Sequence, residues 1–130
     1  MKIREIFPNS TLDSVTISND PIPAELLQKG VEQLGVQRDN YKLISYNNHP
    51  VGFIAFSKQD QFYKIESIYV DAKKKGIASK AISQVIGNNP AFAFVEPENI
   101  ASMSLFTKLG FEVESQRKID GVLYNVVVRT

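Results

Sequence analysis

The first residues whose types and spacing could bind a ligand form a lysine-rich loop that leads into a glycine. Lys73, Lys74 and Lys75 follow an apolar run, and Gly76 opens a segment with helical spacing. Backbone N–H groups at a helix start lack intrahelical partners, and the helix dipole favours an anion there. Gly76 permits close backbone approach, and the small Ala78 keeps the first turn open. The segment suits a pyrophosphate group; the alternative is a solvated basic loop.

A second group of residues starts at Asn99. Asparagine is a good helix N-cap, and the apolar spacing that follows predicts a helix over residues 99–109. Gly110 lies just past the helix end, as is typical of helix termination, and leads into Phe111. The alternative is that these residues only begin and end an ordinary helix.

Composition excludes several other kinds of chemistry. The chain of 130 residues has no cysteine and one histidine, His49, which lies in an expected turn. Disulfides, thiolate metal sites, a cysteine nucleophile and a multi-histidine metal site are therefore excluded. The formal charge of +1 argues against a dedicated nucleic-acid-binding protein.

Length and apolar content predict one domain, residues 1–130, with 43% apolar residues to fill its core. No apolar run reaches the roughly 18–20 residues needed to span a bilayer. The first residues lack an apolar stretch of signal-peptide length. We expect a cytoplasmic protein without a membrane partner.

The elements that would position these residues follow from hydrophobic spacing. Residues 1–6 alternate weakly and are compatible with an edge strand, residues 8–22 are expected to be loop, and a helix is expected from Pro23 to about Leu34. A hairpin of 41–46 and 51–57 around the turn 47–50 follows, and then a strand at 62–70 and a helix at 76–87. The next element is an apolar strand at 91–95, which is expected to be buried on both faces. The last elements are the helix 99–109 and a hairpin of 111–117 and 122–129 around Asp120-Gly121.

The strand–helix–strand unit from residue 62 to residue 95 implies a right-handed crossover and a parallel strand pair. The predicted fold class is therefore α/β, with a mixed, mostly antiparallel sheet flanked by helices.

In this order and spacing, the two groups resemble the GNAT superfamily of N-acetyltransferases. The family signature Gln/Arg-x-x-Gly-x-Gly/Ala falls on residues 73–78. The second family pattern, Asn-x-x-Ala/Ser-x-x-Leu-Tyr-x-x-x-Gly-Phe, is matched at Asn99, Ser102, Leu105, Gly110 and Phe111. The close resemblance covers residues 41–111 and implies a GNAT-like acyl-CoA N-acyltransferase fold, with acetyl-CoA as co-substrate and no metal.

Three positions depart from the family pattern. Lys73 stands where glutamine or arginine is usual, and Val70 lies closer to Gly76 than in typical members, so the loop is short. Phe106 stands where many members carry a tyrosine that protonates the departing CoA thiolate.

The resemblance also implies which residues hold the cofactor. The strand before the loop would splay from its neighbour and pair through its backbone with the pantetheine arm. The loop and helix start would hold the pyrophosphate, and the next helix would reach the pantetheine. The implied cofactor-binding residues are Ile68, Tyr69, Val70, Lys73, Lys74, Lys75, Gly76, Ile77, Ala78, Ser79, Asn99, Ser102 and Phe106.

Acetyl transfer to an amine needs a proton acceptor, because an amine with a pKa of about 10.4 is mostly protonated at neutral pH. A carboxylate can take that proton directly or through water. Glu66, four residues before Val70, is the first candidate. Polyamine and aminoglycoside acetyltransferases have a glutamate in a similar register. The alternative is a glutamate paired across the sheet, for instance with a lysine.

Glu96 and Tyr124 are the other catalytic candidates. Glu96 ends a strand that opens toward the same cleft, with a surface or helix-start role as the alternative. Tyr124, like Tyr69, carries the phenolic proton that Phe106 lacks, and otherwise is an aromatic residue of the sheet.

These residues predict an N-acetyltransferase that moves an acetyl group from acetyl-CoA to a primary amine by direct attack. The expected acceptor is a small cationic amine, and the protein is expected to be a monomer or homodimer without a nucleic-acid partner. A non-catalytic acyl-CoA-binding module of the same fold is the alternative, and Phe106 and the short loop favour it.

Overall fold

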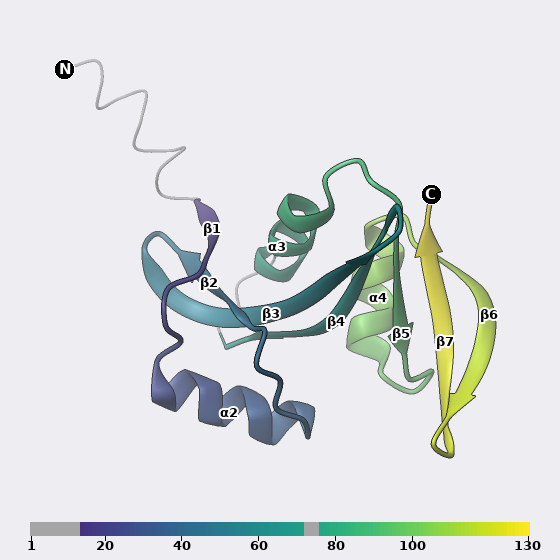
Figure 1. Cartoon of the computed structure of the whole chain (residues 1–130), viewed down its shortest axis with the longest axis horizontal. Coiled ribbons are helices and arrows are strands. Elements are labelled where there is room, and N and C mark those ends of the chain that lie inside the picture. Colours follow the sequence, from purple (N-terminus) through teal and green to yellow (C-terminus); the bar gives the residue numbers. More distant parts are fainter. Residues whose placement is uncertain (1–13, 72–75) are drawn as a thin grey trace.

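Seven strands form a single mixed sheet in the order β1-β2-β3-β4-β5-β7-β6 (Figure 1). The computed structural model describes residues 14–71 and 76–130. The strands are β1 (Val15–Ser18), β2 (Lys42–Tyr46), β3 (His49–Gln59), β4 (Phe62–Val70), β5 (Ala91–Val95), β6 (Glu112–Ile119) and β7 (Val122–Arg129), and the helices are α2 (Ala24–Leu34), α3 (Ile77–Ile86) and α4 (Ile100–Lys108). All strand pairs are antiparallel except β4 with β5. The predicted mixed α/β sheet and its parallel pair are confirmed.

Strand β1 corrects the prediction of a loop over residues 8–22. Val15 to Ser18 pair with the free edge of β2, and Val15 is buried in the core. Prolines and polar residues surround this short stretch, so its alternation of apolar and polar residues does not predict a strand. The weak strand predicted over residues 1–6 lies outside the described residues.

Both predicted hairpins form, each around a two-residue turn. Asn47 and Asn48 have φ values of 52° and 71°, and Asp120 and Gly121 have values of 52° and 83°. Two successive residues with positive φ are the mark of the type I′ turn, whose twist matches that of the strands. The first turn is therefore shorter than predicted, and His49 begins β3 instead of lying in the turn.

Helices cover the two faces of the sheet unequally. α3 and α4 lie on one face, and α2 lies on the other, near β2 to β4 (Figure 1). The core under α3 and α4 contains fourteen buried residues of the described chain, among them Ile54, Ile82 and Phe106. The core under α2 contains four, namely Leu26, Leu43, Phe53 and Tyr69. Most of the apolar burial is thus on the α3 and α4 side.

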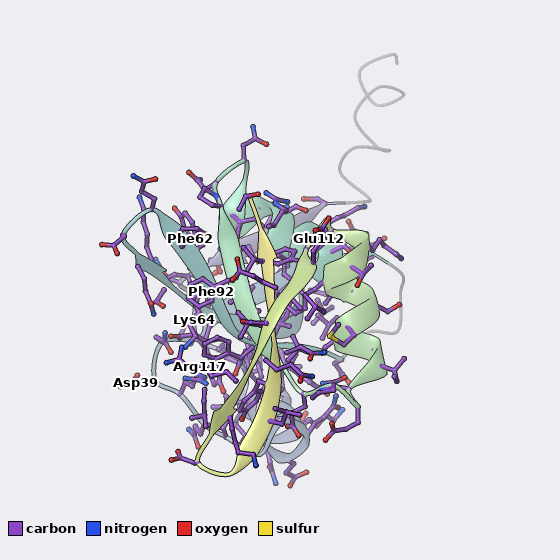
Figure 2. The ribbon with its side chains drawn as sticks, turned by 90° about the vertical axis from the view of Figure 1, so that its right-hand side faces the viewer. Asp39, Phe62, Lys64, Phe92, Glu112 and Arg117 are labelled. Atoms are coloured by element: carbon purple, nitrogen blue, oxygen red, sulfur yellow. The ribbon has the colours of Figure 1, made fainter. Side chains whose placement is uncertain are left out.

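Strand β5 is buried on only one face, which corrects the expectation of burial on both. Ala91, Ala93 and Val95 are buried against α3 and α4, whereas Phe92 and Phe94 are half-buried. Phe92 packs on Phe94 with ring centroids 5.8 Å apart. Figure 2 shows Phe92 on the face of the sheet away from α4. Because α2 covers only β2 to β4, this part of the sheet keeps an open aromatic face.

Candidate active site

A bulge in β4 determines how the candidate site is built. Ala55 of β3 lies opposite Ser67, and the next residue, Phe56, lies opposite Ile65, so Glu66 is the extra residue. An extra residue interrupts the alternation of side chains along a strand. Glu66 and Ser67 consequently both contact groups on the α2 side: Glu66 meets Asn40 and Ser57, and Ser67 meets Arg38.

The splay that the family resemblance implies begins at the same place. β4 pairs with β5 only over Tyr63 to Ile65, and β5 continues beside β7 alone. β4 from Ser67 to Val70 pairs with β3 and has no second strand partner among the described residues. Its open backbone edge includes Ile68 and Val70, the two predicted main-chain contacts of the pantetheine arm.

A cavity of about 310 Å³ lies between the separated strands. It is lined by all three predicted catalytic residues, Glu66, Glu96 and Tyr124, and by four of the predicted cofactor residues, Ile68, Asn99, Ser102 and Phe106. These residues come from β4, β7, α4 and the segment between β5 and α4. The structure therefore brings together residues that are distant in the sequence.

A second cavity, of about 640 Å³, adjoins the first through shared residues. Its lining comes from Glu66 and from the segment between α2 and β2. Arg38 and Glu66 line both cavities. Glu66 is therefore accessible from both cavities.

Glu66 is half-buried and takes neutral hydrogen-bond donors. Asn40 Nδ2 donates to Glu66 Oε1 at 3.2 Å, and Ser57 Oγ donates to Oε2 at 3.1 Å. The pairing with a lysine considered from the sequence is not found, because the one ion pair among the described residues joins Lys29 and Asp71. Each carboxylate oxygen accepts more than one hydrogen bond, so Glu66 retains capacity for an amine.

Phe106 and Tyr124 lie on the walls of the 310 Å³ cavity. Phe106 is buried and packs edge-on against Phe111, with ring centroids 5.0 Å apart. Tyr124 is half-buried, with its ring centroid 6.2 Å from that of Phe94. Tyr124 is the tyrosine among the residues that line this cavity.

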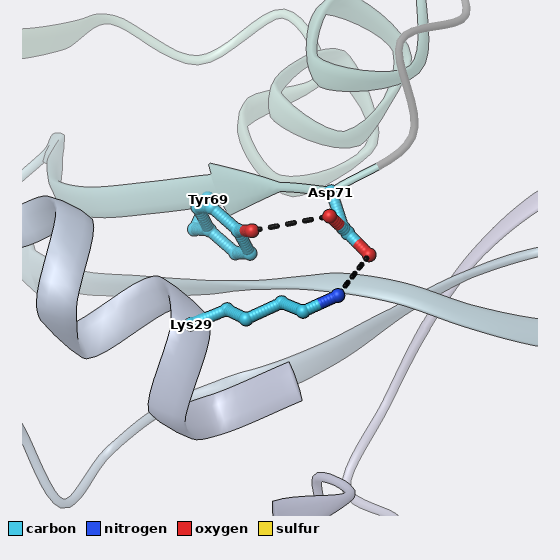
Figure 3. A network of polar contacts seen from close by, with 3 residues as sticks. All are labelled: Lys29, Tyr69 and Asp71. Carbon is cyan, nitrogen blue, oxygen red and sulfur yellow. Dashed lines mark hydrogen bonds and ion pairs between the residues drawn. The ribbon is translucent and has the colours of Figure 1, made fainter. Parts of the chain in front are cut away.

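Tyr69 is placed away from this cavity. Its ring packs on Phe53 in the core under α2, with centroids 5.5 Å apart. Its hydroxyl donates a hydrogen bond to Asp71 Oδ1 at 3.3 Å, and Asp71 Oδ2 lies 3.6 Å from Lys29 Nζ (Figure 3). The backbone of Tyr69 belongs to the open edge of β4, but its side chain ties the strand end to α2.

The buried position of Tyr69 predicts a loss of stability at alkaline pH. Burial, followed by the neighbouring Asp71 carboxylate, raises the pKa of the Tyr69 hydroxyl above 10.0. The folded state thus favours the neutral phenol, so this contribution is complete below pH 10 and is lost as the pH rises through the folded-state pKa. We expect Tyr69→Phe to reduce the fall in unfolding free energy above pH 10. Urea unfolding from pH 8 to 11 measures the unfolding free energy of both proteins. Parallel curves of this free energy against pH for the wild type and Tyr69→Phe would contradict the prediction.

Gly76 is the N-cap of α3, at the position where the sequence predicts an anion site. Its φ of +89° lies in the left-handed region that favours glycine, and no side chain caps the helix. The N–H groups of Ile77, Ala78 and Ser79 have no intrahelical acceptor, because they form the first turn. The lysines predicted to assist, Lys73, Lys74 and Lys75, lie outside the described residues.

Asn99 is the N-cap of α4, as predicted. Its Oδ1 accepts a hydrogen bond from the Ser102 backbone N–H at 3.2 Å, and both residues line the 310 Å³ cavity. The cap therefore lies at the wall of the 310 Å³ cavity.

Replacing Asn99 with alanine is expected to have two separable effects. Loss of the cap lowers the free energy of unfolding by about 1 kcal/mol. Loss of the carboxamide weakens CoA binding. Asn99→Ser is the matched control, because serine also caps helices but is too short to replace the amide. Thermal unfolding and calorimetry with CoA measure both effects; unchanged values in the alanine variant would remove Asn99 from both roles.

Sequence reasoning missed several residues at the site. Arg38 and Asn40 lie in the segment between α2 and β2, and Ser57 and Lys64 lie on adjacent strands. None of them belongs to a motif. The only available signal is that Lys64 lies two residues before Glu66, a spacing that places both side chains on one face of a strand.

Within residues 14–71 and 76–130, no group of three or more metal-ligating side chains is close enough together to hold a metal ion. No helix in these same ranges is long and apolar enough to cross a membrane.

Comparisons with known proteins agree with this geometry. Solved structures with the same fold include Arabidopsis thaliana Naa50 in complex with the bisubstrate analogue CoA-Ac-MVNAL (TM-score 0.62, 20% identity, 90% of this chain and 99% of that chain). They also include a GNAT-family acetyltransferase from Bacillus cereus (0.69, 14%, 90% and 97%) and the ribosomal-protein-S18-alanine N-acetyltransferase from Escherichia coli (0.60, 16%, 88% and 91%). No curated protein sequence matches the chain. The model of the acetyltransferase (GNAT) family matches residues 6–111, and the chain therefore belongs to this family.

Proposed function

We propose that the protein is an acetyl-CoA-dependent N-acetyltransferase that acts by direct attack of a primary amine. The observation that carries the proposal is the 310 Å³ cavity, where Glu66, Glu96 and Tyr124 meet the open edge of β4 and the start of α4. The bisubstrate analogue bound to the Arabidopsis structure supports a CoA and an acceptor site side by side in this fold.

Each residue has a distinct task in this mechanism. Acetyl-CoA supplies the acetyl group as a thioester. Backbone groups of Ile68 and Val70 bind the pantetheine arm, and the start of α3 binds the pyrophosphate. Glu66 accepts the proton of the attacking amine. A backbone N–H of the open β4 edge stabilises the developing oxyanion, and Tyr124 returns a proton to the sulfur.

The acceptor predicted from the sequence, a small cationic amine, rests on a glutamate at the acceptor side, for which Glu66 is the first candidate. Two of the similar structures are described with a peptide portion or a ribosomal-protein acceptor, which supports a protein or peptide N-terminus as the second acceptor class. Both classes present a primary amine, so the proposed reaction is the same.

An acetyl-CoA turnover screen tests the proposal. Spermidine, an aminoglycoside, free amino acids and short peptides with free N-termini are incubated with acetyl-CoA, and free CoA thiol is measured. We expect turnover with at least one of these amines. Gly76→Val is the negative control, because valine disfavours the φ of +89° required at the anion site. Tight CoA binding without turnover of any amine would favour the non-catalytic acyl-CoA-binding module.

A further inference from the structure

The candidate site contains positive charges that the proposed mechanism does not use. Arg38 and Lys64 are both half-buried and line the 310 Å³ cavity together with Glu66. Arg38 Nε donates a hydrogen bond to Ser67 Oγ at 3.1 Å. Lys64 Nζ lies 4.8 Å from the centre of the Phe94 ring. Both cations are thus held in place by neutral groups.

Neither cation forms an ion pair with a carboxylate within the described part of the chain. The one ion pair of residues 14–71 and 76–130 joins Lys29 and Asp71. Glu66 lines the same two cavities as Arg38 but takes its hydrogen bonds from Asn40 and Ser57. The site therefore presents separate negative and positive groups that a ligand of both charges would satisfy.

A third cation extends the positive side along the open aromatic face. Arg117 of β6 lies with its Cζ 5.9 Å from the centre of the same Phe94 ring. Figure 2 shows Lys64 and Arg117 on the same face of the sheet, away from α4. A polycation in the cavity would meet like charges on this side, which disfavours it.

From this arrangement we infer that the acceptor carries a carboxylate a short distance from its reactive amine, and that Arg38, assisted by Lys64, binds that carboxylate. The inference rests on the proposed function and names the acceptor class for the same site. It replaces a polyamine-like acceptor with a zwitterion or an acidic peptide N-terminus.

The spacing between the carboxylate and the amine of the acceptor follows from how the bulge in β4 positions Arg38 and Glu66. Arg38 is held by Ser67, which directly follows Glu66, and both of these side chains point to the α2 side. The guanidinium that binds the carboxylate is thus anchored one residue from the glutamate that receives the amine proton. Among the residues that the structure describes, Arg38 is engaged through Nε alone, so its terminal N–H groups can form a planar, two-pronged hydrogen bond to a carboxylate.

This carboxylate has two possible sources. In a free amino acid it is the α-carboxylate, and in a peptide it is an aspartate or glutamate side chain at the first or second position. The recognising chemistry is the same for both, so the test includes a matched pair for each.

The experiment compares matched acceptors that differ in one negative charge. The first pair is an amino acid and its amide, and the second is a peptide with aspartate or asparagine at position two; spermidine is the polycation. For one of these pairs, we expect the acidic member to have a kcat/KM higher by about 10- to 100-fold, the range of a charge-assisted hydrogen bond. The pair that shows the preference identifies the source.

Arg38→Gln tests the residue. We expect the ratio of kcat/KM between acidic and neutral members to fall about tenfold, through KM of the acidic acceptor. Lys58→Gln is the matched control, because Lys58 is an exposed cation over Tyr63, whose ring packs against the core under α3 and α4. In Lys58→Gln, the ratio of kcat/KM between acidic and neutral members should stay at the wild-type value. Thermal unfolding verifies that each variant is folded.

Two results would overturn the inference while leaving the proposed function intact. One is turnover of spermidine or of neutral acceptors at least as efficient as that of the acidic members. The other is a change of kcat/KM in Arg38→Gln that is equal for the acidic and the neutral member of a pair. Absence of turnover with every amine overturns the proposed function itself, and the inference with it.

Discussion

Glu66→Gln is expected to lower turnover by about 10²–10⁴-fold, the usual contribution of a general acid–base group. Glutamine keeps the size of the side chain and the ability to hydrogen-bond Asn40 and Ser57, so the β4 bulge should be preserved. It cannot accept the amine proton. CoA affinity is expected to stay unchanged, because the proposed cofactor contacts come from the β4 backbone, from the start of α3 and from Asn99.

The pH dependence separates the possible roles of Glu66. If it accepts the proton, the deficit of Glu66→Gln shrinks as the pH approaches the pKa of the amine, because solvent then deprotonates more of the acceptor. If it only attracts the ammonium form, KM rises while kcat is kept. Steady-state kinetics from pH 6 to 10 measure both parameters.

Glu98→Gln is a matched control, since Glu98 is an exposed carboxylate that is not among the residues lining the 310 Å³ cavity. It should behave as the wild type. An unchanged kinetic profile for a well-folded Glu66→Gln would exclude Glu66 as the base and make Glu96 the next residue to replace.

Gly52→Ala is expected to destabilise the fold by about 1–3 kcal/mol or more and to weaken CoA binding. Gly52 lies opposite Val70 in the β3–β4 pair. A Cβ at this position would collide with the carbonyl oxygen of Tyr69 and lie 2.9 Å from Val70 Cα. Both are backbone atoms, so the clash is relieved only by moving the end of β4, whose other edge is the proposed pantetheine contact.

Gly30→Ala separates a general loss of stability from a local effect on the cofactor. A Cβ on Gly30 would collide with the ring of Phe53 and approach the ring of Tyr69, which are side chains of the core under α2. We expect reduced stability but near-normal CoA affinity. Denaturant unfolding and calorimetry apply to both variants. Equal CoA affinity for Gly52→Ala and the wild type would disprove the link between the end of β4 and the cofactor.

The parts of the site that sequence predicts well are those encoded in local runs of residues. The apolar pairs of α3, the five apolar residues of β5 and the Asn99 cap each leave a periodic or terminal signal, and their observed bounds agree with prediction to within a residue or two. The start of α3 at Gly76 was predictable for the same reason, because the helix and its leading glycine are adjacent in the chain.

The remaining features depend on contacts between distant segments. The bulge at Glu66 is a mismatch of register between β3 and β4, and no single strand encodes it. Arg38 reaches the site because the segment after α2 lies against Ser67. The short strand β1 forms because β2 has a free edge to pair with, although its own surroundings have the composition of a loop.

The unequal cores have a consequence for the order in which parts of the molecule open. Among the described residues, four buried side chains hold α2 to the sheet, whereas fourteen lie under α3 and α4. Local opening in proteins starts where the fewest apolar contacts must be broken. Amide hydrogens of α2 should therefore exchange with solvent before those of α3 and β5. A transient opening of α2 would therefore leave the larger core under α3 and α4 intact.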